Sequence, residues 1–364
     1  MEVVDVAIVG AGPAGSSCAA FCASAGLRVA LIEREKFPRE KVCGDCINPA
    51  CVPVLRRLGL GDKVETWPHA FADAVDFVAI NGRRVRAVFP SGPARIVTIK
   101  RSVFDDHLLQ RARSLGTKVF EQATVVGVHK TRDRDWKIDI VHETLLARVL
   151  VGADGRNSTV ARLCNLLPRP ARERIALQAH VPLPRNFGNR IVLQFLPEGY
   201  SGQAPVNDRE LNLCLVGTPP TIAALRSWAE REFKLPNDQP WRTITPLTRA
   251  PVPVAHENLL FVGDAAQVVE PFTGEGIYYA LRSGELAADA IIKIFRGEDR
   301  QPAVKEFAQA HRAMYRGRLW INRFARAAVL RPQIASRLLA LTPFSAPILR
   351  RLTRNIVRAP DAQP

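Results

Sequence analysis

A glycine-rich turn between a strand and a helix is the feature that most constrains this fold. Residues 4–9 form an apolar run typical of a buried strand, and Gly10-x-Gly12-x-x-Gly15 follows it directly. Residues 16–24 are rich in Ala and Cys and predict a tightly packed helix. In this context the glycines permit a tight turn, close approach of the backbone to a pyrophosphate, and close packing of helix on strand. The sequence therefore predicts a βαβ unit that binds a dinucleotide at the helix N-terminus.

An acidic residue closes the second strand of this unit. Residues 27–32 predict that strand, and Glu33 ends it. A carboxylate at this position accepts hydrogen bonds from ribose hydroxyls and favours a free 2′-hydroxyl over a 2′-phosphate. The alternative, a glycine turn without a ligand, is disfavoured by the combination of turn, helix and acid. The candidate cofactor-binding residues of the unit are Gly10, Gly12, Pro13, Ala14, Gly15, Glu33 and Arg34.

The rest of the chain predicts two regions of different character. Strands are expected near 74–80, 85–89, 95–99, 119–128, 136–141 and 145–151, with a helix over 102–114. Residues 168–247 are richer in Pro, with strand-like runs that predict an antiparallel sheet, and a strand at 259–262 and a helix at 276–295 follow. We predict a discontinuous dinucleotide-binding domain (1–70, 97–167 and 248–300), a substrate-binding sheet domain (71–96 and 168–247) and a basic helical C-terminal region (301–364).

The charge balance of the chain is strongly basic. The 364 residues include 51 Lys and Arg against 35 Asp and Glu, a formal net charge of +16. Such an excess favours anionic partners such as a dinucleotide, an acidic lipid surface or a carrier protein, although a generally basic surface is the alternative. We predict no nucleic-acid partner. Much of the excess lies between residues 300 and 358. The tail from residue 320 to 358 mixes apolar residues with Arg, which predicts either a helical cap on the core or an interfacial region on an anionic membrane.

Cysteine usage and hydropathy bear on the location of the protein. The seven Cys are odd in number, and a disulfide framework is untypical of a chain of this size. No run of 18 or more apolar residues and no signal-peptide pattern is seen. We therefore expect a cytoplasmic protein, with the basic tail allowing a position peripheral to the inner face of the membrane.

Motifs separated along the chain resemble one superfamily. Val-Gly-Ala-Asp-Gly-Arg-Asn-Ser at 151–158 and Gly-Asp-Ala at 263–265, together with the glycine turn, resemble the FAD-binding superfamily of aromatic-ring hydroxylases, the group A flavoprotein monooxygenases. Cys-Gly-Asp at 43–45 and Pro-Phe-Thr-Gly-Glu-Gly-Ile at 271–277 resemble its geranylgeranyl-reductase-like branch. The resemblance covers residues 3 to 295. It implies an α/β fold, namely a Rossmann-like FAD-binding domain with an inserted antiparallel-sheet substrate domain and a helical C-terminal region.

The resemblance also implies roles for individual residues. Asp264 would hold a ribityl hydroxyl of FAD, and Arg101 would reach the chain that links the two halves of the cofactor. The backbone at 274–276 would approach the flavin, and Val125 or Val126 would pair with the adenine. The residues implied to bind the cofactor are Cys43, Gly44, Arg101, Val125, Asp154, Gly155, Gly263, Asp264, Gly274, Gly276 and Ile277.

Three residues are candidates for the reaction site. Cys43 begins a Cys-x-x-Cys pattern with Cys46, which is interpreted as a flavin-lining loop, as structural cysteines, or as a redox dithiol or half a metal site. No fourth ligand is clustered with them, so no metal site is predicted. Tyr200 and Gln203 lie in a segment expected between two strands. They would either orient a substrate or form a turn with ordinary polar surface.

The chemistry is expected to come from the cofactor. The chain shows no Ser-His-Asp grouping, no His-Glu-x-x-His and no paired carboxylates, and it has only seven His. Two reactions on an apolar small molecule remain open: reduction or dehydrogenation of C=C bonds in an isoprenoid, and hydroxylation of an aromatic or polyketide compound. A non-catalytic flavin-binding protein is a further alternative. One dinucleotide fingerprint is present and is assigned to FAD, so NADPH or NADH is expected to bind transiently as electron donor, with ferredoxin as the alternative.

Overall fold

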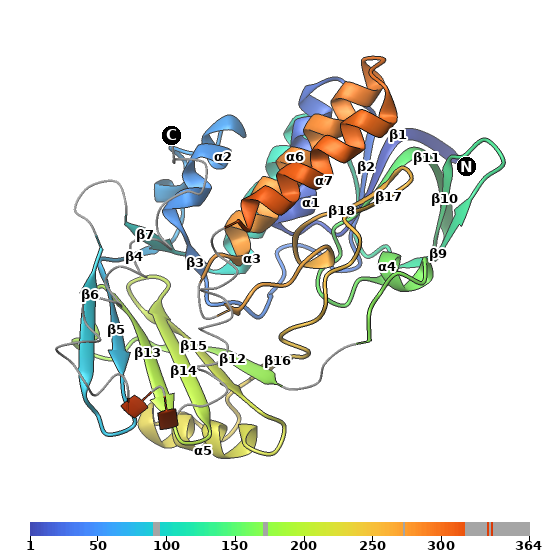
Figure 1. Ribbon diagram of the computed structural model, residues 1–364. Coiled ribbons are helices and arrows are strands. Elements are labelled where there is room, and N and C mark those ends of the chain that lie inside the picture. The colour runs from blue at the N-terminus through green and yellow to red at the C-terminus, as the bar shows by residue number, and fades with distance from the viewer. Residues whose placement is uncertain (90–94, 170–173, 272–273, 317–332, 335, 338–364) are drawn as a thin grey trace.

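The computed structural model describes residues 1–89, 95–169, 174–271, 274–316, 333–334 and 336–337. Its first sheet is mainly parallel and has the order β17-β18-β11-β1-β2-β8, with β10 and β9 added antiparallel beside β11 (Figure 1). The innermost strands read as nearly continuous apolar runs because layers of chain cover both faces of the sheet. The strands are β1 (Glu2–Val9), β2 (Val29–Ile32), β8 (Lys118–Phe120), β9 (Val125–Lys130), β10 (Trp136–Ile140), β11 (Glu143–Gly152), β17 (Ala255–His256) and β18 (Leu259–Phe261).

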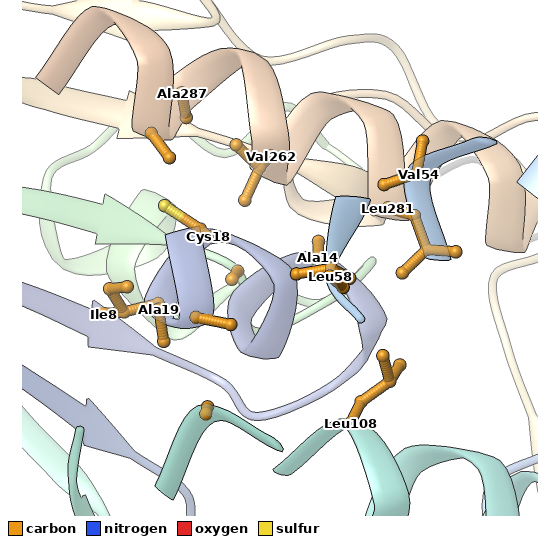
Figure 2. Close-up of a cluster of buried hydrophobic side chains, with 14 of the residues drawn as sticks. Ile8, Ala14, Cys18, Ala19, Val54, Leu58, Leu108, Val262, Leu281 and Ala287 are labelled. Carbon is orange, nitrogen blue, oxygen red and sulfur yellow. The ribbon is translucent and has the colours of Figure 1, made fainter. Parts of the chain in front are cut away.

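Helices pack on this sheet around the glycine turn. The sequence pattern of α1 (Pro13–Ser24) leaves only small side chains toward α6 (Gly276–Phe295), so the two backbones approach closely. A Cβ on Gly284 would lie 2.3 Å from the Ala14 carbonyl oxygen. Figure 2 shows the resulting core, in which Cys18 of α1 lies near Val262 and Ala287. The other helical elements are α2 (Val52–Arg57), α3 (Arg101–Ser114), α4 (Thr159–Leu163), α7 (Arg300–Met314), η1 (Pro49–Cys51), η2 (Val64–Thr66) and η3 (Gly263–Ala265).

A second sheet of seven strands forms the other half of the molecule (Figure 1). Its order is β16-β12-β15-β14-β13-β5-β6, and α5 (Ile222–Glu232) packs against it. A three-stranded sheet, β3-β7-β4, joins the two halves. The strands are β3 (Cys46–Ile47), β4 (Ala70–Ala72), β5 (Ala74–Val78), β6 (Arg84–Val88), β7 (Ile96–Thr98), β12 (Ile175–Pro182), β13 (Arg190–Leu196), β14 (Gly199–Pro205), β15 (Glu210–Gly217) and β16 (Arg242–Ile244).

The structure corrects four sequence predictions. The segment expected between two strands is itself strand β14, paired on both sides, which explains its small and apolar residues. The second sheet is not wholly antiparallel, because β5 and β13 arrive from distant parts of the chain and pair in parallel. The single strand expected over 119–128 is two strands, β8 and β9, separated by Gln122 with a φ of +55°. The helix predicted from residue 102 begins at Arg101, without a side-chain cap.

The C-terminal region is described only in part. Helix α7 agrees with the helical prediction for its beginning, and it packs on α6. The tail predicted from residue 320 to 358 lies almost wholly outside the described residues. Among the helices that the structure describes, none combines the length and apolarity needed to span a bilayer.

Candidate functional site

One cavity of about 920 Å³ extends from the glycine turn to the inner face of the second sheet. Apart from Gly15, and from Val126 offered as the alternative to Val125, every residue predicted from the sequence to bind the cofactor borders this cavity, as do Tyr200 and Gln203. Gly15 lies behind the turn and is buried. These residues come from elements spread over most of the chain, so the fold gathers the residues of separate motifs around one cavity.

The glycine turn has the geometry that a phosphate-bearing cofactor requires. Gly10 has a φ of +102°, and a Cβ there would lie 2.5 Å from the Ala153 carbonyl oxygen. A Cβ on Gly15 would lie 1.8 Å from the carbonyl oxygen of Gly10. The helix can therefore pack this closely on the turn only when residue 15 is glycine. Gly12 borders the cavity. The turn therefore fits a pyrophosphate held at the N-terminus of α1, as in dinucleotide-binding folds.

Glu33 is held rigidly at the end of β2. Its carboxylate accepts hydrogen bonds from the backbone N–H groups of Ala11, at 2.9 Å, and Glu35, at 3.1 Å. The side chain is buried yet borders the cavity. This places an oriented carboxylate beside the glycine turn, where the prediction of a ribose contact requires one.

Two arginines hold Asp264 in place, one through its carboxylate and one through its backbone. The second, Arg249, was not among the residues predicted from the sequence. Arg156 Nη2 lies 3.1 Å from Asp264 Oδ2. The Arg249 guanidinium donates to the backbone carbonyls of Asp264 and Ala265, both at 2.5 Å, and to that of Arg156 at 2.8 Å. Arg249 carries no motif in the sequence, because its partners are backbone oxygens that only the fold brings to it. The arrangement ties η3 to the loop after β11.

Asp154 and Arg101 have structural partners within the cavity wall. The Asp154 carboxylate accepts from the Ser158 hydroxyl and the Thr159 N–H, both at 2.6 Å, and so holds the start of α4. Burial raises the pKa of Asp154, and these hydrogen bonds oppose the rise. Arg101 donates from Nε and Nη2 to the buried carboxylate of Asp105, each at 2.7 Å. Asp105, one turn along α3, therefore orients the guanidinium expected to face the cofactor.

Of the two valines expected to pair with adenine, the structure favours one. Val125 is buried and borders the cavity. Val126 alternates to the other face of β9 and is 56% exposed. Of the two, Val125 is therefore the one placed for the predicted backbone contact with the adenine.

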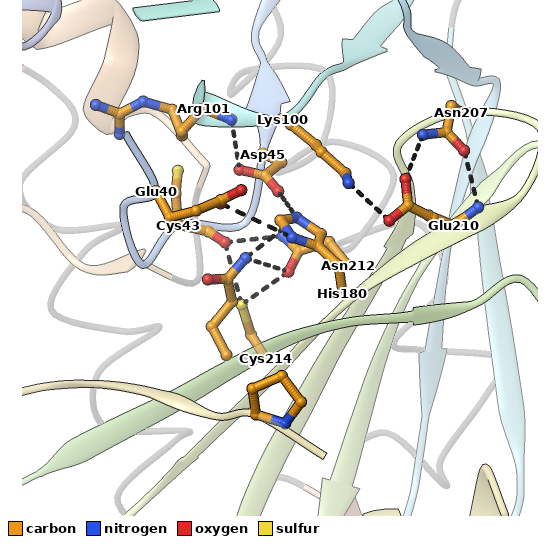
Figure 3. A network of polar contacts seen from close by, with 12 residues as sticks. Glu40, Cys43, Asp45, Lys100, Arg101, His180, Asn207, Glu210, Asn212 and Cys214 are labelled. Atoms are coloured by element: carbon orange, nitrogen blue, oxygen red, sulfur yellow. Dashed lines mark hydrogen bonds and ion pairs between the residues drawn. The ribbon is translucent and has the colours of Figure 1, made fainter. Parts of the chain in front are cut away.

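A polar network joins the Cys43–Cys46 loop to the second sheet (Figure 3). His180 Nε2 of β12 lies 2.8 Å from Asp45 Oδ2, and Asn212 Nδ2 of β15 donates to the Cys43 carbonyl at 2.8 Å. Cys214 Sγ lies 3.2 Å from the same carbonyl oxygen. His180 and Asn212 are 135 and 169 residues from their partners Asp45 and Cys43, so no sequence pattern indicated them.

The cysteines near the cavity are free thiols in a buried setting. Burial raises the pKa of Cys43, although the adjacent Arg101 guanidinium opposes the rise, and burial also raises the pKa of Cys46. A protonated thiol is a poor nucleophile and metal ligand. Within the described ranges, no three His, Cys, Asp or Glu side chains gather closely enough to hold a metal ion. The geometry favours the interpretation of this loop as a wall of the cofactor cavity.

The far half of the cavity is apolar. Tyr200 and Gly202 of β14 lie on the face of the sheet that borders it. Gln203 also borders the cavity, and its side-chain amide donates to the Ser201 hydroxyl at 3.3 Å and to Gln194 Oε1 at 3.4 Å. Tyr200 is buried, and this burial raises the pKa of its phenol. The apolar side chains of this half are Val75, Phe77, Phe89, Ile96, Ile191, Leu193, Val216, Ile244 and Leu247.

Comparison with known proteins agrees with these features. A family model described as "FAD binding domain" matches residues 3–183. Menaquinone reductase from Mycolicibacterium smegmatis is 32% identical over 315 residues, 78% of this chain and 75% of that protein. Digeranylgeranylglycerophospholipid reductase 1 from Methanothermobacter thermautotrophicus is 29% identical over 304 residues, 78% of this chain and 76% of that protein. The solved structure of the flavin-dependent brominase Bmp2 superposes with a TM-score of 0.78 at 20% identity, covering 99% of this chain and 96% of that one, and shows the same fold.

Proposed function

Because this chain belongs to the FAD-dependent oxidoreductases of the aromatic-ring hydroxylase superfamily, within its geranylgeranyl-reductase-like branch, we propose that it reduces carbon–carbon double bonds in the prenyl chain of a lipid-like substrate. The observation that carries this proposal is the division of the cavity into two halves. One half offers the glycine turn, Glu33 and Asp264 to a dinucleotide. The other half is walled by aliphatic and aromatic side chains of the second sheet.

The residues of the chain would hold the two reactants against each other. FAD, when bound, supplies the hydride chemistry that the protein itself lacks. The segment Gly274–Gly276 lies at the N-terminus of α6, where the helix dipole stabilises negative charge. The apolar walls would bind a prenyl chain by burying it and would keep water away from the reacting bond. The buried phenol of Tyr200 is placed on this wall and would orient the substrate.

Similarity to named reductases supports reduction over hydroxylation. The two curated relatives above are named for the reduction of menaquinone and of a digeranylgeranyl phospholipid. Both names denote molecules that carry long prenyl chains. The brominase shares the fold at 20% identity, which does not transfer its reaction to this chain.

Gly202 offers a direct test of the apolar half. A Cβ on Gly202 would lie 3.7 Å from Leu193 Cδ2 and 3.9 Å from Cys214 Cβ, which are ordinary contacts. Gly202→Ala should therefore be tolerated, whereas the larger side chain of Gly202→Leu should fill the apolar half of the cavity. We expect Gly202→Leu to keep bound FAD but to lower the rate of prenyl reduction about a hundredfold or more. The reason is that a prenyl chain displaced from the apolar half of the cavity no longer reaches the cofactor.

The measurement is an anaerobic single turnover. FAD in the enzyme is reduced with dithionite, menaquinone or a geranylgeranyl lipid is added, and flavin absorbance and product mass are followed. Gain of two hydrogens in the prenyl chain, which remains after the quinone ring is reoxidised in air and is located by mass fragmentation, supports the proposal. If the lipids leave the flavin reduced, and an aromatic substrate instead gains one oxygen atom on admission of air, the enzyme is a hydroxylase and the proposal is wrong.

We further propose NADPH or NADH as the electron donor and an anionic membrane surface as a partner of the basic C-terminal region. A lipid-like substrate supports a position at the membrane, and the net charge of +16 supports attraction to acidic lipids. Replacing dithionite by either nucleotide in the single-turnover experiment tests the donor. If neither nucleotide bleaches the flavin, the donor is of another kind.

A further inference from the structure

Four cationic side chains meet in the wall of the cavity beside the glycine turn. They are Arg39, Lys41, Arg101 and Arg156. Three of them have carboxylate partners. Arg39 Nη1 lies 3.1 Å from Asp105 Oδ2, Arg101 pairs with the same carboxylate, and Arg156 pairs with Asp264. Lys41 differs, because its ammonium group has no hydrogen-bond or ion-pair partner among the residues that the structure describes.

The surroundings of Lys41 are unfavourable to its charge. The side chain is half-buried, and its Nζ lies 4.0 Å from the position that a Cβ on Gly155 would take. The charged groups that act most strongly on it are Arg101 from α3, Arg39 from its own loop and Arg156 from the loop after β11, together with the acid Asp264 of η3. Burial, followed by the repulsion of the three arginines, lowers the pKa of Lys41 to about 8, and Asp264 opposes this effect.

A half-buried amine among three guanidinium groups is placed to receive an anion. Gly155 lies beside it, and the neighbouring Arg39 places its Nη2 3.6 Å from the position that a Cβ on Gly12 of the glycine turn would take. Gly12, Gly155, Arg39 and Lys41 all border the same cavity. A doubly negative pyrophosphate entering this space would replace repulsion by attraction and would favour the protonated amine. Neither the motif resemblance nor the family match points to this lysine.

We propose that Lys41 binds a phosphate of FAD, and that FAD binding above neutral pH is accompanied by uptake of one proton on Lys41 Nζ. The proton comes from solvent, and the neutral amine becomes an ammonium ion paired with the phosphate. Lys41 is thus a cofactor-binding residue whose charge appears in full only in the complex. The proposal concerns FAD alone, so it stands or falls independently of the prenyl reduction proposed above.

The first test is the pH dependence of FAD affinity. The apoprotein is titrated with FAD, and the dissociation constant is measured by quenching of flavin fluorescence. Because the pKa of Lys41 is near 8 before binding and is raised in the complex, the dissociation constant should increase about tenfold between roughly pH 7 and pH 9. Riboflavin, which lacks phosphates, should bind weakly and show no such dependence. A flat FAD profile over this range would overturn the proposal.

Substitutions distinguish Lys41 from other groups. Lys41→Arg keeps a positive charge at both pH values, so its FAD affinity should stay constant. Lys41→Gln should bind FAD about a hundredfold more weakly near pH 7, a loss of about 2.7 kcal/mol, and lose the pH dependence, since a charge-assisted hydrogen bond is removed. Lys36→Gln removes an exposed lysine of the same loop and should behave as the wild type. If Lys41→Gln keeps the wild-type profile, the titrating group lies elsewhere.

Calorimetry provides a readout of the proton itself. FAD binding is measured near pH 9 in two buffers of different ionisation enthalpy. The difference in observed enthalpy gives the number of protons taken up, which should approach one for the wild type and zero for Lys41→Arg. Equal proton uptake by the two proteins would contradict the assignment.

Discussion

At the scale of single residues, burial decides the charge of His311. The side chain is 1% exposed between Phe307 and Tyr315, and its Nε2 has no hydrogen-bond partner among the described residues. Burial lowers the pKa of His311 to about 4, so the imidazole is neutral in the folded protein at neutral pH. The unfolded chain takes up this proton already near pH 6.5.

This difference predicts a loss of stability in mild acid. Between pH 6.5 and 4 the unfolded state binds more protons at His311, so the free energy of unfolding should fall by up to about 3 kcal/mol from this residue. Urea unfolding at a series of pH values measures the fall. His311→Leu should show a flatter profile, whereas His142→Leu, at an exposed position, should follow the wild type. Identical profiles for wild type and His311→Leu would contradict this account.

At the scale of elements, one buried contact fastens the loop before β3 to strand β12. Asp45 is fully buried, and burial raises its pKa while His180 opposes the rise. The His180 side chain is 8% exposed and also lies 3.9 Å from Glu40 through its other ring nitrogen. The loop that borders the cofactor cavity is therefore positioned by the substrate half of the molecule.

Removing His180 should affect stability and cofactor binding together. His180→Leu leaves the buried Asp45 without its imidazole partner, so we expect a loss of about 3 kcal/mol in unfolding free energy and weaker FAD binding. His129→Leu is the matched control. Its imidazole lies 3.5 Å from Asp139 Oδ2 but is 63% exposed, and water screens such a pair. Urea unfolding and flavin fluorescence report the two effects, and equal losses in both variants would refute the structural role assigned to His180.

At the scale of the whole molecule, the net positive charge favours binding to anionic surfaces. The proposed membrane contact predicts binding to phosphatidylglycerol vesicles but not to phosphatidylcholine vesicles, with release by salt. Each basic residue near an anionic surface contributes about 1 kcal/mol, so replacing Arg350, Arg351 and Arg354 by Gln should weaken vesicle binding roughly a hundredfold. The control replaces three exposed arginines elsewhere, Arg83, Arg132 and Arg209, with the same change in net charge. Equal weakening in a sedimentation assay would show that only net charge matters.

The sequence by itself determined the features that depend on neighbours along the chain. The glycine turn, helix α1 and Glu33 follow one another closely, and each glycine answers a local steric demand that the structure displays. Helix α6 was predicted with its observed bounds because its apolar positions recur with the helical period. The separate FAD motifs were likewise visible in the sequence, and the cofactor-binding candidates chosen from them border one cavity, apart from Gly15 behind the turn.

Which distant side chains meet depends on the three-dimensional fold. Strand β14 was not predicted because its character comes from pairing with β13 and β15 on either side. The approach of Lys41 to Arg101 and Arg156, and that of His180 to Asp45, joins segments with no shared pattern. Backbone propensity and hydrophobic period act over a few residues, whereas burial and electrostatic interaction depend on distance in space. For that reason the cofactor could be inferred from the sequence, but the groups that set its charge environment could not.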